Sequence, residues 1–212
     1  MPLLEHFDVA RLRHFENGFS AGRSDRPGII VINSGSKKSS RTSCPFAHEL
    51  KYIKAEGQAV AALDSSAVLL QGREVTKRGI KKRWEEAPYL YFATHIVRDP
   101  EIPFLVLIPL VLPEGDLSPE SGFLDFADIR SADFSRCELV VLSGCSSGVP
   151  SVAARNIGPS LGDAFLDAGA AAVITTFWDV KDEGALKLMT LYARELESEN
   201  SSPIRALCNA RR

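Results

Sequence analysis

The stretch that decides the fold is Leu139-Val140-Val141-Leu142-Ser143-Gly144-Cys145-Ser146-Ser147-Gly148. Its apolar first half predicts a buried strand, and the small residues that follow predict an uncrowded turn. That turn carries a cysteine. A second apolar run, Tyr89 to Thr94, ends in the same way at His95. A thiol and an imidazole are therefore expected just past the ends of two strands.

The rest of the chain alternates short apolar runs with segments of helical spacing. Strands are expected over 28–33, 67–70, 89–94, 104–112 (an exposed edge interrupted by prolines), 139–142 and 171–177, and helices over 45–63, 76–84, 123–129, 161–168, 182–197 and 203–210. Residues 1–27 are mixed and polar and are expected to form a short helix and a linker. This alternation predicts an α/β fold with a mostly parallel sheet covered on both faces.

Composition narrows the class of protein. The chain has 212 residues, 45% of them hydrophobic, which suits one well-buried domain. Its net charge of -2 gives no reason to expect nucleic acid or a membrane as a partner. The four cysteines form no CxxC pair, and with four histidines in the chain no metal site or cofactor is expected. Reduced thiols and an N-terminus without a secretory signal favour a cytoplasmic location.

The cysteine and the histidine each have an ordinary explanation. A cysteine after a strand is usually a small buried hydrophobe, and a histidine there is often a structural hydrogen-bonding residue. The polar turn around Cys145, however, is a poor place for a core residue, and its N–H groups suit an oxyanion. In open parallel sheets, ligand chemistry gathers at the carboxyl ends of the strands. The pattern therefore favours a nucleophile and its base, Cys145 and His95.

The same turn also matches the G-x-S-x-G pattern of serine hydrolases, with Ser146 as nucleophile. In that fold the histidine follows the serine along the chain. Here every histidine precedes Ser146, and Pro150 interrupts the helix that should follow. We therefore reject the serine-hydrolase interpretation. A nucleotide-binding domain is set aside as well, because the chain has neither a G-x-G-x-x-G nor a P-loop motif.

Four ordered segments resemble the motifs of CHAT domains, which are caspase-like cysteine peptidase domains related to separase and the caspases. The segments are 92–95, 139–145, 164–170 and 177–182. The resemblance runs from about Pro45 to the C-terminus, so we assign 1–27 to an N-terminal extension and 28–212 to a caspase-like CHAT domain. Residues 202–212 look like the opening of a helix that the family continues further.

The resemblance implies a three-layer α/β/α sandwich and a cysteine endopeptidase. Cys145 would attack a peptide carbonyl, and His95 would promote thiolate formation or protonate the leaving amine. The backbone N–H groups of Cys145 and Ile96 would form the oxyanion hole. The implied partners are a protein or peptide substrate and a tetratricopeptide-repeat or other regulatory module.

Three residues depart from the family pattern. Ile96 stands where glycine usually follows the histidine, Gly144 where alanine usually precedes the cysteine, and Ser146 where an acidic residue commonly follows it. A β-branched residue restricts the backbone and crowds the rim of the cleft. Ile96 therefore motivates an alternative, a catalytically inactive CHAT-like module that acts in protein–protein interaction or regulation.

Substrate-binding residues are harder to select. Asp179, Asp182 and Trp178 follow the 171–177 strand and are candidates for a pocket that takes a basic P1 side chain. Asp182, with Glu183, also suits the N-cap and first turn of the next helix, and Trp178 suits either packing or one wall of the cleft. A basic loop, Lys37, Lys38 and Arg41, is the alternative for an acidic P1 residue, or is simply solvated.

Overall fold

A computed structural model of the chain describes residues 8–12, 25–34, 50–98, 106–111, 118, 122–150, 152–153, 156–198 and 201–211. Its strands are β1 (Asp8–Leu12), β2 (Ile29–Asn33), β3 (Val68–Gln71), β4 (Tyr89–Thr94), β5 (Val97–Arg98), β6 (Val106–Pro109), β7 (Phe123–Leu124), β8 (Leu139–Ser143), β9 (Val152–Ala153), β10 (Asn156–Ile157) and β11 (Ala172–Thr175). Its helices are α1 (Ile53–Ala61), α2 (Lys77–Lys81), α3 (Phe126–Arg130), α4 (Leu161–Asp167), α5 (Asp182–Leu196) and α6 (Pro203–Ala210), with short 3-10 turns at Gly72–Glu74 and Trp84–Glu86.

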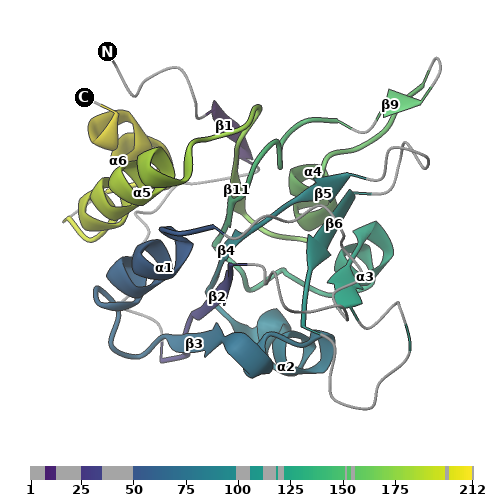
Figure 1. Cartoon of the computed structure of the whole chain (residues 1–212), viewed down its shortest axis with the longest axis horizontal. Coiled ribbons are helices and arrows are strands. Elements are labelled where there is room, and N and C mark those ends of the chain that lie inside the picture. Colours follow the sequence, from purple (N-terminus) through teal and green to yellow (C-terminus); the bar gives the residue numbers. More distant parts are fainter. Residues whose placement is uncertain are drawn as a thin grey trace.

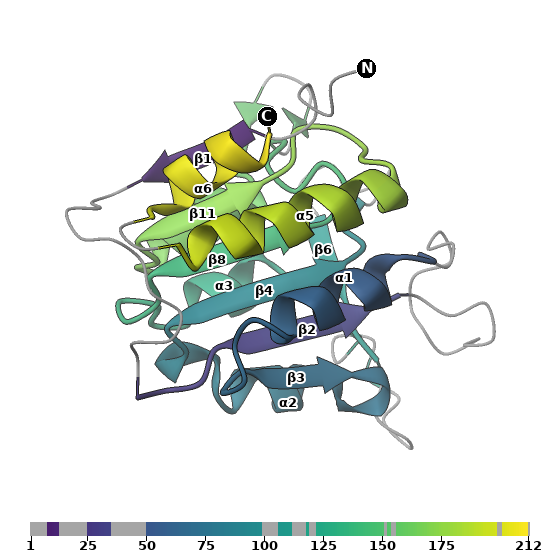
Figure 2. The same cartoon turned by 90° about the vertical axis from the view of Figure 1, so that its left-hand side faces the viewer.

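The central sheet has the strand order β1-β11-β8-β4-β2-β3 (Figure 2). The strands from β11 to β3 pair in parallel, and β1 adds to β11 as an antiparallel edge. The predicted α/β class with a mostly parallel sheet is therefore confirmed.

Helices cover both faces of this sheet. Side chains alternate along β4, so that Leu90 and Phe92 enter one core while Tyr91 and Ala93 enter the other. The first core is closed by α2, α3 and α4, and the second by α1, α5 and α6. Figure 2 shows the second set lying across the near face of the sheet. This confirms the three-layer α/β/α sandwich.

Capping residues fix several helix ends at the positions that the sequence pattern predicts. Ser160 and Asp163 form a reciprocal capping box at the start of α4, and Gly169 beyond its end has a φ of +110°. Ser202 caps α6, whose first residue is Pro203. The bounds of α6 match the predicted 203–210 helix.

Three segments differ in kind from the sequence prediction, and among the described residues the predicted 45–63 helix covers only Ile53–Ala61. Asp8–Leu12 is a strand on β11 and not a helix, while the boundary at residue 27 stays a prediction. Val106–Pro109 is not an exposed edge: it pairs with β5 and β7 in a small antiparallel sheet, and its Val106 and Ile108 are fully buried (Figure 1). The predicted 123–129 helix begins only at Phe126, because Phe123–Leu124 pairs with β6.

The register between β4 and β8 fixes the position of the two candidate catalytic residues. Ala93 lies opposite Ser143 across the parallel pair. His95 and Cys145 each follow two residues later, so both lie at the same carboxyl edge of the sheet. In the part of the chain that the structure describes, no helix is long and apolar enough to cross a bilayer.

Candidate active site

His95 and Cys145 line one pocket at the carboxyl edge of the sheet. The pocket is partly open to solvent. The ends of β4 and β8 form its back, while α1 and the start of α5 form its sides, through residues such as Ile53 and Asp182. The register thus brings the two predicted catalytic side chains to one cavity.

Cys145 is half-buried, and its thiol donates to the carbonyl oxygen of Val180 at 3.8 Å. Burial raises the pKa of this thiol, and the nearby carboxylates of Asp179 and Asp182 raise it further. Its environment therefore holds the sulfur as a neutral thiol at pH 7. Any nucleophilic role requires a base that takes the proton as the reaction begins.

The turn after Cys145 is held in an uncommon backbone conformation. Ser146 has a φ of 55°, a left-handed value that non-glycine residues seldom adopt. Its N–H donates to the carbonyl of Trp178 at 3.2 Å, and its hydroxyl donates to Asp179 at 3.1 Å. From the other side, Arg98 donates to the carbonyl of Ser146 at 2.8 Å. Residues from two neighbouring segments therefore fix the turn that presents the thiol.

Ile96 does not fill the pocket. Its partly buried side chain packs against the core that contains Phe92 and Leu142, and it is not among the described residues that line the pocket. Gly144, the residue before the cysteine, lies directly against it: a Cβ built on Gly144 would be 2.8 Å from Cγ1 of Ile96. The space beside the cysteine that alanine would take is occupied by Ile96 and the backbone of Thr94.

The predicted substrate-binding residues have separate positions. Asp182 lines the pocket and accepts the backbone N–H of Tyr52 at 2.8 Å, which anchors the start of α1. It is the first residue of α5, and the N-cap of that helix is Lys181. Asp179 is exposed beside Ser146, and Trp178 holds the turn through its carbonyl. Lys37, Lys38 and Arg41 lie outside the described residues.

The sequence analysis missed Glu56, which lines the same pocket from α1. Glu56 is only 1% exposed, and its Oε1 accepts the hydroxyl proton of Tyr91 at 2.6 Å. A signal was present in the sequence: Glu56 lies three residues after Ile53 and four before Val60, on the apolar face of the helix. A carboxylate on that face points to a buried role.

The model of the CHAT domain family matches residues 1–212 of the chain. No curated protein sequence matches significantly.

Proposed function

We propose that this chain, which belongs to the CHAT domain family, is a cysteine endopeptidase with Cys145 as nucleophile and His95 as base. The family has a caspase-like fold and is related to cysteine peptidases. The observation that carries the proposal is that both side chains line one pocket at the carboxyl edge of the sheet. A cysteine and a histidine are the two groups that a thiol-dependent acyl transfer requires.

The proposed reaction passes through an acyl-enzyme. His95 takes the proton from the Cys145 thiol as the sulfur attacks the peptide carbonyl, and then returns it to the departing amine. Water hydrolyses the resulting thioester and regenerates the thiol. The backbone N–H groups of Ile96 and Cys145 would stabilise the oxyanion, and each such donor contributes about 3–4 kcal/mol to lowering the barrier in well-studied enzymes.

The substrate is proposed to be a protein segment that enters between α1 and the start of α5. Asp182 contacts it from the side of the pocket, while Asp179 and Trp178 contact it from the segment that holds the Ser146 turn. A tetratricopeptide-repeat or other regulatory module is the proposed protein partner, as the family resemblance suggests.

A second candidate function is a catalytically inactive module that binds other proteins. Its supporting observation is the Cys145 thiol, whose pKa is raised by burial and by two carboxylates. Against it stands the open pocket, which Ile96 leaves unfilled. The two candidates differ in a direct way, because only the peptidase turns over a peptide.

The test is cleavage of a fluorogenic peptide library in which the P1 residue is varied. The wild type is compared with Cys145→Ala and His95→Ala, and Cys208→Ala, which alters an exposed thiol on α6, serves as the matched control. We expect turnover to be lost in the first two variants and kept in the control. Turnover that survives Cys145→Ala would refute the assignment. An inactive wild type with a thiol that resists alkylation would favour the binding module.

A further inference from the structure

The pocket beside Cys145 combines apolar walls with two carboxyl groups. Ile53, Val180 and Ala185 supply apolar surface, while Glu56 and Asp182 supply the carboxyls. Among the described residues, no lysine or arginine lines this pocket. A long side chain with an aliphatic stem and a cationic end matches this combination.

We infer that Glu56 makes this pocket selective for a cationic P1 side chain, arginine or lysine, through a charge-assisted hydrogen bond formed inside the pocket. The inference rests on the proposed peptidase function, because it names the residue that would precede the scissile bond. Asp182 also lines the pocket but already holds the start of α1 through the N–H of Tyr52. Glu56 carries no such backbone contact among the hydrogen bonds of the described residues.

A buried polar group next to Glu56 supports a ligand at this place. The Ser143 hydroxyl lines the pocket, belongs to a residue 7% exposed, and makes no hydrogen bond of ordinary geometry within the described residues. Ser143 lies two residues before the nucleophile at the end of β8. This hydroxyl lies near enough to Glu56 and Tyr91 to influence their pKa values, but a buried hydroxyl that makes no well-formed hydrogen bond costs free energy unless a ligand satisfies it. An arginine side chain has several N–H donors in one plane, enough for both Glu56 and Ser143.

The charge state of Glu56 is linked to this binding. Burial raises its pKa to about 7, against the opposite influence of the Ser143 and Tyr91 hydroxyls, and Asp182 raises it further. At neutral pH and without a ligand, Glu56 is therefore a neutral carboxylic acid in a large fraction of the molecules. A cation entering the pocket favours the carboxylate, so binding should release a proton, and it should strengthen as the pH rises through about 7.

The other ionisable groups around Glu56 come from the elements that pack against α1. Helix α5 contributes Asp182, and also Tyr192, which lies near Tyr91; strand β4 contributes Tyr91 itself. Strands β2 and β8 have no ionisable side chain, while His95 and Cys145 line the same pocket just beyond β4 and β8. Since His95 and Cys145 transfer a proton in the proposed reaction, the test compares two substrates for which the contribution of this pair is the same.

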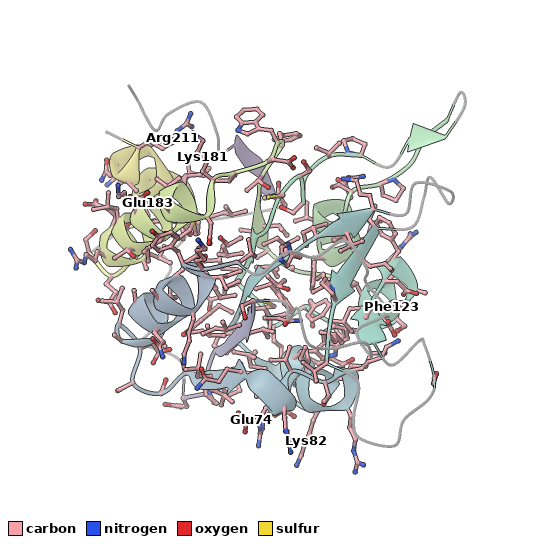
Figure 3. The ribbon with its side chains drawn as sticks, in the orientation of Figure 1. Glu74, Lys82, Phe123, Lys181, Glu183 and Arg211 are labelled. Carbon is pink, nitrogen blue, oxygen red and sulfur yellow. The ribbon has the colours of Figure 1, made fainter. Side chains whose placement is uncertain are left out.

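The first experiment compares two peptides that differ only in having arginine or citrulline at P1. Citrulline has nearly the same shape but no charge. We expect the wild type to prefer arginine in kcat/KM, with a preference that grows from pH 5.5 to pH 8. We expect Glu56→Gln to reduce it by about tenfold or more. Glu183→Gln, an exposed acid on α5 (Figure 3), should leave it unchanged.

The second experiment needs no turnover and separates this inference from the peptidase proposal. Cys145 is modified with the cationic reagent 2-aminoethyl methanethiosulfonate or with the neutral methyl methanethiosulfonate, and exposed Cys208 is the internal reference. We expect the cationic-to-neutral rate ratio at Cys145 to fall severalfold in Glu56→Gln at pH 8, with little change at pH 5.5. If no peptide is cleaved but this ratio falls, the cation pocket stands and the peptidase proposal fails.

Two results would overturn the inference; the first requires a wild type that cleaves peptides, and the second does not. One is a wild type that cleaves arginine and citrulline peptides equally at pH 8. The other is a rate ratio at Cys145 that is the same in Glu56→Gln and the wild type at pH 8. The wild-type comparison needs no variant, so it applies even if Glu56→Gln does not fold.

Discussion

Gly144 and Ile96 are in direct contact beside the candidate nucleophile. A Cβ added to Gly144 would lie 2.8 Å from Cγ1 of Ile96 and 2.5 Å from the carbonyl oxygen of Thr94, both too short for real atoms. The usual family residues at these two places are glycine after the histidine and alanine before the cysteine. In this chain the side chain at this contact belongs to Ile96, after the histidine, and Gly144, before the cysteine, has none. Ile96 is therefore one of two groups that leave no room for a Cβ at Gly144, and the other is the carbonyl oxygen of Thr94.

This contact predicts that Gly144→Ala is destabilising. The added methyl group must displace Ile96 and the Thr94 backbone, an overpacking cost of about 1–3 kcal/mol. In an Ile96→Ala background the cost should be smaller, because only the clash with Thr94 remains. Urea unfolding of the wild type, both single variants and the double variant measures the coupling. Equal costs of Gly144→Ala in both backgrounds would show that the two residues are independent.

Parts of the site that depend on local pattern could be predicted from the sequence. The apolar runs before His95 and Cys145 indicated two strands, and parallel pairing brought their ends together. Glu56 lies on the apolar face of α1, but it was missed because its burial requires α5 to pack over that face, a contact between segments that are distant in the sequence. Strand β1 was missed for the same reason, since its partner β11 is distant in the sequence.

The buried Glu56 predicts a pH-dependent stability. Its pKa is raised from 4.5 to about 7 in the folded protein, so the protonated form favours folding. That contribution is fully present below pH 4.5 and is lost as the pH rises through about 7, amounting to about 3 kcal/mol at most. Glu56→Gln keeps an acceptor for Tyr91 and removes the titration.

Urea unfolding of Glu56→Gln and wild type at pH 5 and at pH 8.5 checks this. The variant should gain stability relative to the wild type at the higher pH. Glu183→Gln, whose side chain is exposed and paired with Lys187, is the matched control and should show no such gain. A difference between Glu56→Gln and the wild type that stays constant with pH would mean that Glu56 does not titrate in this range.

The carboxylates near Cys145 predict how its reactivity can be increased. Asp179 and Asp182 both raise the pKa of the thiol, in addition to burial. Replacing either by asparagine should lower that pKa and increase the thiolate fraction at pH 7.5. Alkylation of Cys145 by iodoacetamide should then become severalfold faster. The rate at exposed Cys208 in the same sample should not change.

The two substitutions differ in their structural risk. Asp182→Asn removes a charge next to the backbone N–H of Tyr52, whereas Asp179→Asn alters only an exposed contact with Ser146. Asp179→Asn is therefore the cleaner test. If iodoacetamide alkylates Cys145 at the wild-type rate in both variants, these carboxylates do not control the pKa of the thiol.

Arg98 is predicted to hold the Cys145 turn in place. Its guanidinium donates to the carbonyl oxygens of Ser146 and Val149, and it reaches them from β5, which begins two residues after His95. This contact links the histidine segment to the cysteine turn and supports the left-handed backbone at Ser146. Arg98→Met keeps most of the side-chain bulk and removes both donors, so the amides of 146–149 should exchange with solvent faster.

Hydrogen exchange followed by mass spectrometry measures that effect. Arg130→Met is the matched control, because Arg130 makes an exposed ion pair with Asp167 far from the turn. In the peptidase assay, Arg98→Met should lower kcat more than it changes KM, since a loosened turn misplaces the sulfur in the transition state. Arg98→Lys should restore activity only in part, because both hydrogen bonds come from one guanidinium nitrogen, Nη2, and an ammonium group directs its donors differently. Unchanged exchange at 146–149 in Arg98→Met would show that the hydrogen bonds from the turn to the carbonyl oxygens of Trp178 and Thr176 hold it without Arg98.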